Sequence, residues 1–537
     1  MTSETATLLY RRVEALADLD SDAVEVRNRS LHAALAQVCH EGVKDTGMVF
    51  GNLFSQVDYL CRSRAVGAAD RQEIQTMRRH SNSTDPIADA DWPYDLRALA
   101  LLVSAVTSTD VPSTLVGRLP VMGRPADLGH TIDRRYLRCV VTDHDDQFIH
   151  VHADGDGTGD TYIVDYTAHS YLQPLLKRGM QLNLIDCHEG KHLEPGLIIV
   201  EPDYLLDISQ IARCFTDYGH HPLAYVANRL SPAANSYAIL LGNFAGRALD
   251  DIINHPKDYD WLDTLRTNFR ERALDYCTCP DFAGGATFKV DAKTQVDNLC
   301  GIVDNLFAPD PASRRRHYRR DRAILEPSFV CERLGIQGRI DLMTTDMRLL
   351  VEQKSGRNYN IERGYANQYG SYQKEDHYVQ LLLYAGLLRQ NFGLGRRKTD
   401  IRLLYSKYPL PGGLVAVNEY QALFREAIAL RNRIVAQDYA IAHDGFGSII
   451  DQLTPETINE RQLSTRFFSD YILPQLQRLL SPLHTMSAVE HAYFCTMATF
   501  VMREQLAAKV GSNEGVSASM ADLWNMPLAT KREMGNI

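Results

Sequence analysis

The sequence predicts an α/β protein in which an αβββαβ core follows a small all-β unit, with helical regions at both ends of the chain. Three observations predict this class. Apolar residues recur at helical spacing near both ends of the 537-residue chain. Short runs of β-branched and aromatic residues, separated by turn residues, follow the first helical stretch. Further along, three strand patterns are followed by a helical pattern and one more strand.

Residues 1–111 are expected to be helical, because apolar residues recur with a helical period around positions 5–18, 28–41 and 94–107. The first residues, MTSETATLLYRRVEALADLD, mix charged and apolar side chains and lack the apolar core of a signal peptide. No run of about 18 apolar residues occurs, so we expect no membrane span and a cytoplasmic protein.

Residues 112–204 change character and predict a small all-β unit, which we expect to be an OB-like barrel. The glycine-rich run DGDGTGD at 154–160 has some features of a Ca²⁺ loop. It lacks a bidentate acid at the required offset, so it favours a hairpin loop. The expected strands are 138–141, 148–152, 161–164, 181–185 and 196–200.

Residues 205–412 supply the core, with its elements in the order α-β-β-β-α-β. Between the first helix and the first strand, residues 256–320 are expected to form an insertion. The first expected strand carries Glu326, which as a lone acid before Pro327 could also be a turn residue. The expected elements are a helix at 239–253, a strand at 324–330, a hairpin around 338–354, a helix at 377–389 and a strand at 399–407.

The hairpin is predicted because two apolar-rich runs are joined by a polar turn, Thr344-Thr345-Asp346. Asp341 falls on one arm, and Glu352 and Lys354 fall near the end of the other. Glu352 and Lys354 are two residues apart, so on a strand their side chains point to the same face. Two carboxylates and an ammonium on one face are costly to keep away from water. A divalent metal that neutralises the acids, with the lysine facing a water or a phosphate, would account for them.

Three motifs carry a family resemblance. They are Gly338…Asp341, then Glu352…Lys354 followed by Ser355-Gly356, and then Gln380…Tyr384, which share a helix face at i and i+4. This combination resembles the restriction-endonuclease-like core of PD-(D/E)XK nucleases, in their RecB-like branch. The resemblance covers roughly residues 205–409 and is to the nuclease regions of large helicase–nucleases that act in replication and repair.

The resemblance implies a metal-dependent nuclease. Asp341, Glu352 and Glu326 would bind one or two Mg²⁺ or Mn²⁺ ions, and in the family the backbone carbonyl at Gln353 commonly completes such a site. The metal would lower the pKa of a bound water and stabilise charge on the scissile phosphate. Lys354 would orient or polarise the attacking water.

The helix motif and one arginine have lesser expected roles. Gln380 and Tyr384 would hydrogen-bond the backbone or metal-bound waters, although Tyr384 could instead be a core aromatic residue with a satisfied hydroxyl. Arg339 flanks the site, where either a phosphate contact or a surface ion pair is expected.

The chain departs from the family at Gly246, which stands where these nucleases usually carry a histidine in the helix before the core. His255 lies more than two turns further on and is expected at the surface. The departure removes one metal ligand. We therefore expect one well-formed site, at most a weak second one, and higher activity with Mn²⁺ than with Mg²⁺.

The ten cysteines show no spacing typical of a disulfide scaffold. Some relatives hold a [4Fe–4S] cluster with one cysteine before the core and three after it. Cys214 stands about where the first would be, but only Cys495 follows the core, so no iron–sulfur cluster is expected. Cys277 and Cys279 form a lone C-x-C pair that could join His220 or His255 at a zinc site, or remain free thiols.

The net charge is −10, from 57 basic and 67 acidic residues, so DNA binding would need a local basic patch. The candidate is the run at 314–322, just before the Glu326 strand. The alternative is a solvated positive turn with ion pairs to nearby acids. The expected DNA-binding residues of this run are Arg315, Arg316, Arg319 and Arg320.

Residues 413–537 are again expected to be helical, with a capping box at Ser487 opening a helix that runs to about Lys509. No P-loop motif occurs, so a helicase is expected as a separate protein or as C-terminal sequence beyond this chain. Two functions remain open. One is a nuclease for single-stranded or flap DNA in replication, repair or recombination, and the other is a non-catalytic DNA-binding scaffold for a helicase. The intact Asp341, Glu352 and Lys354 favour the first, and Gly246 favours the second.

Overall fold

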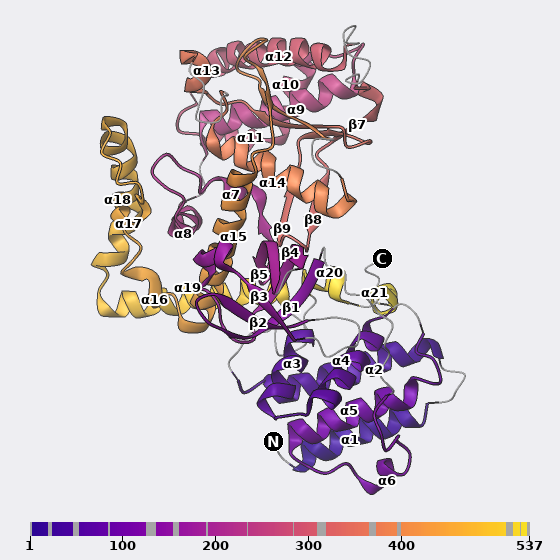
Figure 1. Cartoon of the computed structure of the whole chain (residues 1–537). Helices are drawn as coiled ribbons and strands as arrows, with labels where there is room; N and C mark the ends of the chain where they lie inside the picture. Colours follow the sequence, from indigo (N-terminus) through magenta and orange to yellow (C-terminus); the bar gives the residue numbers. More distant parts are fainter. Residues whose placement is uncertain are drawn as a thin grey trace.

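The computed structural model shows a mixed α/β protein. Figure 1 shows helices from the N-terminal part of the chain at one end, the central mixed sheet with its covering helices at the other, and a small barrel between them. The structure describes residues 3–19, 24–46, 53–83, 86–124, 136–153, 161–189, 192–232, 235–282, 284–308, 318–364, 372–394, 399–511, 519–526 and 528–533.

The N-terminal region is a helical bundle, as predicted. Its apolar faces pack into a core of their own, in which Leu31, Leu60 and Leu99 are fully buried. The helices are α1 (Ser3–Ala17), α2 (Val24–Val43), α3 (Leu53–Ser63), α4 (Ala68–Asn82), α5 (Trp92–Thr107) and α6 (Ser113–Val116).

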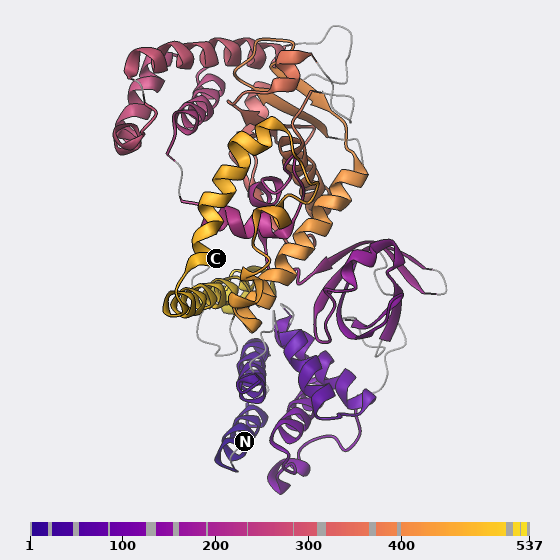
Figure 2. The same cartoon turned by 90° about the vertical axis from the view of Figure 1, so that its left-hand side faces the viewer.

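The five strands predicted between residues 112 and 204 are all present, and they close into a barrel with the order β1-β2-β3-β5-β4. Figure 2 looks along this barrel. Neighbouring strands pair antiparallel except β3 and β5, which pair parallel. The DGDGTGD run lies outside the described residues. The elements are β1 (Tyr136–His144), β2 (Phe148–Ala153), β3 (Thr161–Asp165), the 3-10 helix η1 (Thr167–Leu172), β4 (Gln181–Glu189) and β5 (Leu193–Val200).

The central sheet has the order β13-β12-β11-β10-β7, and only β11 and β12 in it pair parallel among the described strands. Helix α14 connects these two parallel strands, as a crossover between parallel strands requires. The elements are β7 (Ala323–Leu325), β10 (Leu342–Thr344), β11 (Leu349–Lys354), α13 (Tyr359–Arg363), α14 (Glu375–Phe392), β12 (Asp400–Tyr405) and β13 (Leu414–Val417).

Helices cover both faces of this sheet. Leu349 and Val351 of β11 pack with α9 (Tyr237–Asn254) and α12 (Gly285–Phe307), whereas Leu350 packs on the opposite face with α14. This alternation along β11 is the two-residue period of a strand. It places Glu352 and Lys354 on the α14 side.

The strand predicted at 324–330 is wrong in one respect, since it is broken at Glu326-Pro327 into β7 and β8 (Ser328–Cys331). Pro327 has no N–H for the ladder and Glu326 has φ +50°, so the chain bends there. Strand β8 instead pairs in a second sheet, of order β6-β9-β8, whose other strands are β6 (Leu206–Asp207) and β9 (Ile336–Arg339).

The predicted insertion at 256–320 is helical where the structure describes it. Gln295 and Asn298 of α12 donate to the backbone carbonyls of Ser355 and Ser406, at 3.2 Å and 2.9 Å, so this helix is anchored to the ends of β11 and β12. The remaining elements before β7 are α7 (Ile208–Ala212), α8 (Pro222–Leu230), α10 (Trp261–Glu271), α11 (Ala273–Thr278) and the 3-10 helix η2 (Arg320–Arg322).

The C-terminal region is helical, as predicted, and the capping box at Ser487 opens α19 (Ala488–Val510). The fully buried Arg431 of α15 (Gln421–Asp444) donates to the carbonyls of Gly335, Glu201 and Tyr204, and so joins barrel, core and C-terminal region. No helix in the described part of the chain is long and apolar enough to cross a membrane. The other elements are α16 (Gly447–Ile450), α17 (Pro455–Ile458), the π-helix η3 (Phe468–Ile472), α18 (Leu473–Thr485), α20 (Asp522–Asn525) and α21 (Leu528–Glu533).

Candidate active site

The β10–β11 hairpin and the residue before it bring the predicted acids and lysine together. Asp341 lies between β9 and β10 rather than on a strand, and its Oδ2 accepts a hydrogen bond of 2.6 Å from the backbone N–H of Gln353. Lys354 Nζ lies 2.8 Å from Glu352 Oε1, which confirms that these two side chains share a face of β11. Gln353 lies between them and contributes its backbone N–H to Asp341.

Helix α14 supplies Gln380 directly above this face. Its Nε2 donates to Glu352 Oε1 at 2.6 Å, and its Oε1 accepts from Lys354 Nζ at 2.8 Å. One amide therefore fixes both the carboxylate and the ammonium. Glu352 and Gln380 are buried, and Lys354 is about one fifth exposed, so water has only restricted access to this group.

Tyr384 lies one turn further along α14 and contacts the backbone of the segment before Asp341. Its hydroxyl donates to the carbonyl of Arg339 at 2.6 Å, and a Cβ at Gly338 would lie 2.7 Å from Cε1 of its ring. Because the glycine of the G-x-x-D motif has no Cβ, the backbone can pack directly against the ring of Tyr384. Tyr384 holds the segment that ends at Asp341, so its place fits a positioning residue with a satisfied hydroxyl.

Glu326 and Arg339 lie at the exposed rim of the group. Their side chains form an ion pair of 3.0 Å, and both are about half exposed, so the pair contributes little to stability. The backbone N–H of Glu326 donates to the carbonyl of Asp341 at 3.0 Å. The bend at Glu326 therefore places the third predicted acid next to Asp341.

Burial disfavours the ionised forms of the acids in this group. Burial raises the pKa of Glu352 to about 8, with the nearby Asp341 as the second cause, and burial also raises the pKa of Asp341. The second oxygen of Glu352, Oε2, is buried and has no hydrogen-bond partner in the described part of the chain. Buried polar atoms are rarely left without a partner, so this oxygen lacks a donor or a cation.

Asp250 of α9 is a fourth acid that the sequence reasoning missed. Burial raises its pKa to about 7, and Glu326 and Asp341 are among the nearby charges that add to the shift. It lies one turn after Gly246, where a Cβ would meet nothing within 4 Å. The available signal was the i, i+4 spacing from Gly246, which puts Asp250 on the same helix face. The prediction considered only histidines on this helix, at positions 246 and 255.

These side chains suit a hard divalent cation, although the described residues contain no group of three or more His, Cys, Asp or Glu side chains arranged to bind a metal as they stand. Carboxylate oxygens are the donors that Mg²⁺ and Mn²⁺ prefer. A cation beside Glu352 would satisfy its unpartnered oxygen and would favour the ionised forms of Asp250, Asp341 and Glu352, whose pKa values burial raises. The residues therefore fit the metal that the sequence implied.

The basic run before β7 is only partly described. Arg315 and Arg316 lie outside the described residues. Arg319 pairs with Asp321 and Arg320 with Asp304, all at or near the surface. Their predicted role in DNA binding stays a prediction.

The cysteines are all free thiols, with Cys214 and Cys279 buried and Cys277 exposed. His220, a candidate zinc ligand with Cys277 and Cys279, lies next to two carboxylates. Its Nδ1 lies 2.5 Å from Glu426, and its other ring nitrogen lies 3.5 Å from Glu375. His255 is exposed at the end of α9, as predicted.

No protein-family model and no curated protein matches this chain. The resemblance to PD-(D/E)XK nucleases therefore rests on the motifs and on the geometry of the residues that carry them.

Proposed function

We propose that this protein is a divalent-metal-dependent DNA nuclease that hydrolyses phosphodiester bonds, acting on single-stranded or flap DNA together with a helicase. The observation that carries the proposal is the buried Glu352 carboxylate. One of its oxygens is held by Lys354 and Gln380, and the other has no partner among the described residues. Burying a carboxylate with one oxygen unsatisfied is costly, and a bound metal ion would satisfy that oxygen.

The fold supports the proposal at two places. In the central sheet, β7, β10 and β11 follow α9 along the chain, and α14 then leads to the parallel strand β12, which is the order of a restriction-endonuclease-like core. The barrel order β1-β2-β3-β5-β4, with η1 between β3 and β4, fits an OB-like barrel, a fold that often binds single strands.

The roles of the side chains follow from their places. Asp341, Glu352, Asp250 and Glu326 would hold Mg²⁺ or Mn²⁺, and the bound metal supplies an activated water and offsets charge on the phosphate. The ammonium of Lys354 is held by two contacts of 2.8 Å on the same face of the sheet. A cation fixed in advance stabilises charge that develops on a phosphate oxygen without reorganising.

A non-catalytic DNA-binding scaffold is the second candidate. Gly246 in place of the usual histidine favours it, and so does the ion pair between Lys354 and Glu352, which occupies both groups. Under this alternative the pair is structural, and its removal changes stability but no cleavage exists to lose.

Cleavage of labelled single-stranded DNA separates the two. Wild type, Lys354→Ala and Lys293→Ala are compared in Mg²⁺, in Mn²⁺ and in EDTA. Lys293 is a matched control, since its ammonium pairs with Asp297 on the exposed side of α12. The proposal expects metal-dependent cleavage by wild type and Lys293→Ala, and at least a hundredfold loss in Lys354→Ala, in the range of removing a charge-stabilising group. Cleavage that survives both EDTA and Lys354→Ala would reject it.

A further inference from the structure

A pocket of about 640 Å³ opens between the N-terminal helices and the barrel, away from the acids of the candidate active site. One wall comes from α3, the start of α4 and the turn between them. The other comes from β1 and the turn before β4. Three arginines and one aspartate are the charged residues of the lining: Arg62, Arg71, Arg178 and Asp58.

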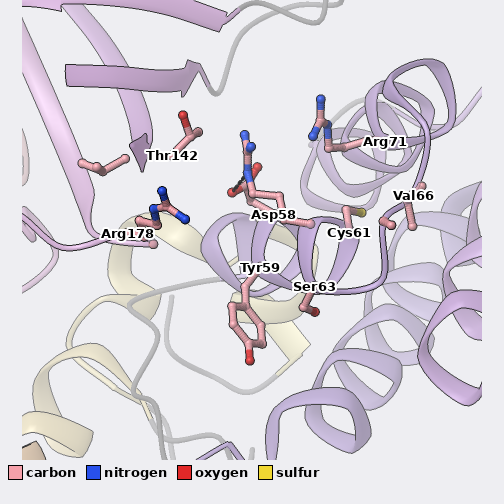
Figure 3. Close-up of a pocket in the computed structure, with 12 residues that line it drawn as sticks. Asp58, Tyr59, Cys61, Ser63, Val66, Arg71, Thr142 and Arg178 are labelled. Atoms are coloured by element: carbon pink, nitrogen blue, oxygen red, sulfur yellow. Dashed lines mark hydrogen bonds and ion pairs between the residues drawn. The ribbon is translucent and has the colours of Figure 1, made fainter. Parts of the chain in front are cut away.

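The guanidinium groups reach the pocket from both walls. Figure 3 shows Arg71 on the helix side and Arg178 on the barrel side, with Asp58 between them. Arg71 makes no hydrogen bond or ion pair with any side chain that the structure describes. Arg178 pairs at 2.9 Å with Asp143, and both side chains are mostly exposed, so solvent weakens this pair.

Arg62 uses only part of its donor set. Its Nε donates to Asp58 Oδ2 at 2.8 Å, while its Nη2 is buried and has no partner in the described ranges. Asp58 is itself buried, so its carboxylate serves to orient Arg62. Burial raises the pKa of the Cys61 thiol to about 12, so this lining residue is neutral and Asp58 is the acidic residue of the lining, against three arginines.

We propose that this pocket binds a phosphate of a single-stranded nucleic acid, and this inference rests on the proposed function. Guanidinium groups with unused donors are the groups that bind phosphate oxygens most specifically. Thr142 also lines the pocket, and its hydroxyl donates to the carbonyl of His150 at 3.0 Å. The barrel supplies one wall of the pocket, so a single-stranded nucleic acid bound on the barrel would reach these arginines.

The acidic total of the chain makes such a local site necessary. A net charge of −10 repels nucleic acid at long range, so binding depends on positive charge gathered at particular places. The pocket brings Arg62 and Arg71 together with Arg178, which lies more than a hundred residues after them in the sequence. No local run of basic residues reveals it.

The test is binding of fluorescein-labelled oligo(dT) to the full chain in EDTA, where no metal-dependent cleavage takes place. The variant Arg71→Gln/Arg178→Gln is compared with the matched variant Arg118→Gln/Arg466→Gln, whose arginines do not line the pocket. The inference expects at least a tenfold loss of affinity in the pocket variant only. The slope of log affinity against log salt should also fall by about 0.7 for each phosphate that the variant no longer binds.

Competition separates the sources of phosphate. Inorganic phosphate should displace oligo(dT) only at concentrations far above that of the oligonucleotide, because a single phosphate lacks the rest of the nucleic-acid strand. Displacement of oligo(dT) by low inorganic phosphate would instead show a site for the free ion and overturn the inference. Equal binding by the two double variants, both with the wild-type melting temperature, would also overturn it.

The binding test of the pocket can succeed or fail independently of the cleavage test. If the Arg71→Gln/Arg178→Gln variant loses oligo(dT) affinity and wild type cleaves nothing in Mn²⁺, the nuclease proposal fails while the pocket stands. If wild type cleaves and the pocket variant binds normally, the pocket fails while the nuclease stands.

Discussion

At the scale of single residues, Glu352 concentrates the unusual chemistry of this protein. It is buried, its pKa is raised to about 8, and one of its oxygens has no partner in the described part of the chain. Core positions of a strand normally carry apolar residues, because a buried carboxylate lowers the stability of the fold. A carboxylate at this position therefore points to a function.

Replacing Glu352 by glutamine should abolish cleavage and leave the folded protein no less stable without metal. The amide keeps the shape of the side chain but cannot be ionised, so the cost of burying a charge beside Asp341 disappears. Cleavage rates and melting temperatures in EDTA check both parts. A melting temperature several degrees below that of the wild type would show that the carboxylate is structural.

Asp250 should matter for cleavage although no sequence motif marks it. Asp250→Asn is expected to lower the cleavage rate at least tenfold at limiting Mn²⁺, because one oxygen ligand beside Glu326 and Asp341 is weakened. Asp251→Asn is the control, since the carboxylate of Asp251 accepts from Thr264 on α10. Equal rates for the two variants would remove Asp250 from the site.

At the scale of elements, the strands and helices were predictable where their period is undisturbed. The five barrel strands, α9, α14 and β12 lie close to their predicted ranges. A continuous strand was predicted across Glu326 because the apolar pattern continues there, and the turn before Pro327 that the structure shows was only the alternative. Two roles could not be predicted, that of Tyr384 against Gly338 and that of the buried Arg431. Both depend on contacts between distant segments, which a sequence pattern does not contain.

The contact between β9 and α14 gives a test at this scale. Gly338→Ala places a Cβ 2.7 Å from the ring of Tyr384, so the variant should lose about 1–3 kcal/mol of unfolding free energy, and cleavage should fall as Asp341 moves. Gly301→Ala on α12 is the control, since its Cβ meets nothing within 4 Å and alanine favours a helix. Urea denaturation of both variants measures the difference. Equal stabilities would mean that the ring does not constrain the motif.

At the scale of the whole molecule, the buried hydrogen bonds of Arg431 connect α15 with the barrel and the core. Glu201 follows β5, and its carboxylate accepts from the backbone N–H of Gln181 at 3.1 Å. Burial raises its pKa to about 7. The folded state therefore keeps a proton that the unfolded chain releases near pH 4.5.

This linkage predicts how stability depends on pH. The contribution of Glu201 is fully present below about pH 4.5 and is lost as the pH rises through about 7, because deprotonation then costs the folded state more than the unfolded one. Glu201→Gln should remove this decline and be more stable than wild type at pH 8 by at least about 1 kcal/mol. Denaturation midpoints in EDTA between pH 5 and pH 8 measure it. Parallel curves for the two proteins would contradict it.

Binding of Mn²⁺ to the full chain tests most directly whether the acids around Glu352 form a metal-dependent catalytic site. Calorimetry near pH 7 should show binding to wild type with release of protons, since burial raises the pKa of Glu352 to about 8 and that of Asp250 to about 7 and metal binding favours their ionised forms. The heat should vary with the ionisation enthalpy of the buffer. Glu352→Gln should lose this binding, and Lys293→Ala should keep it. Absence of binding to wild type, or equal binding by Glu352→Gln, would contradict the assignment of the active site.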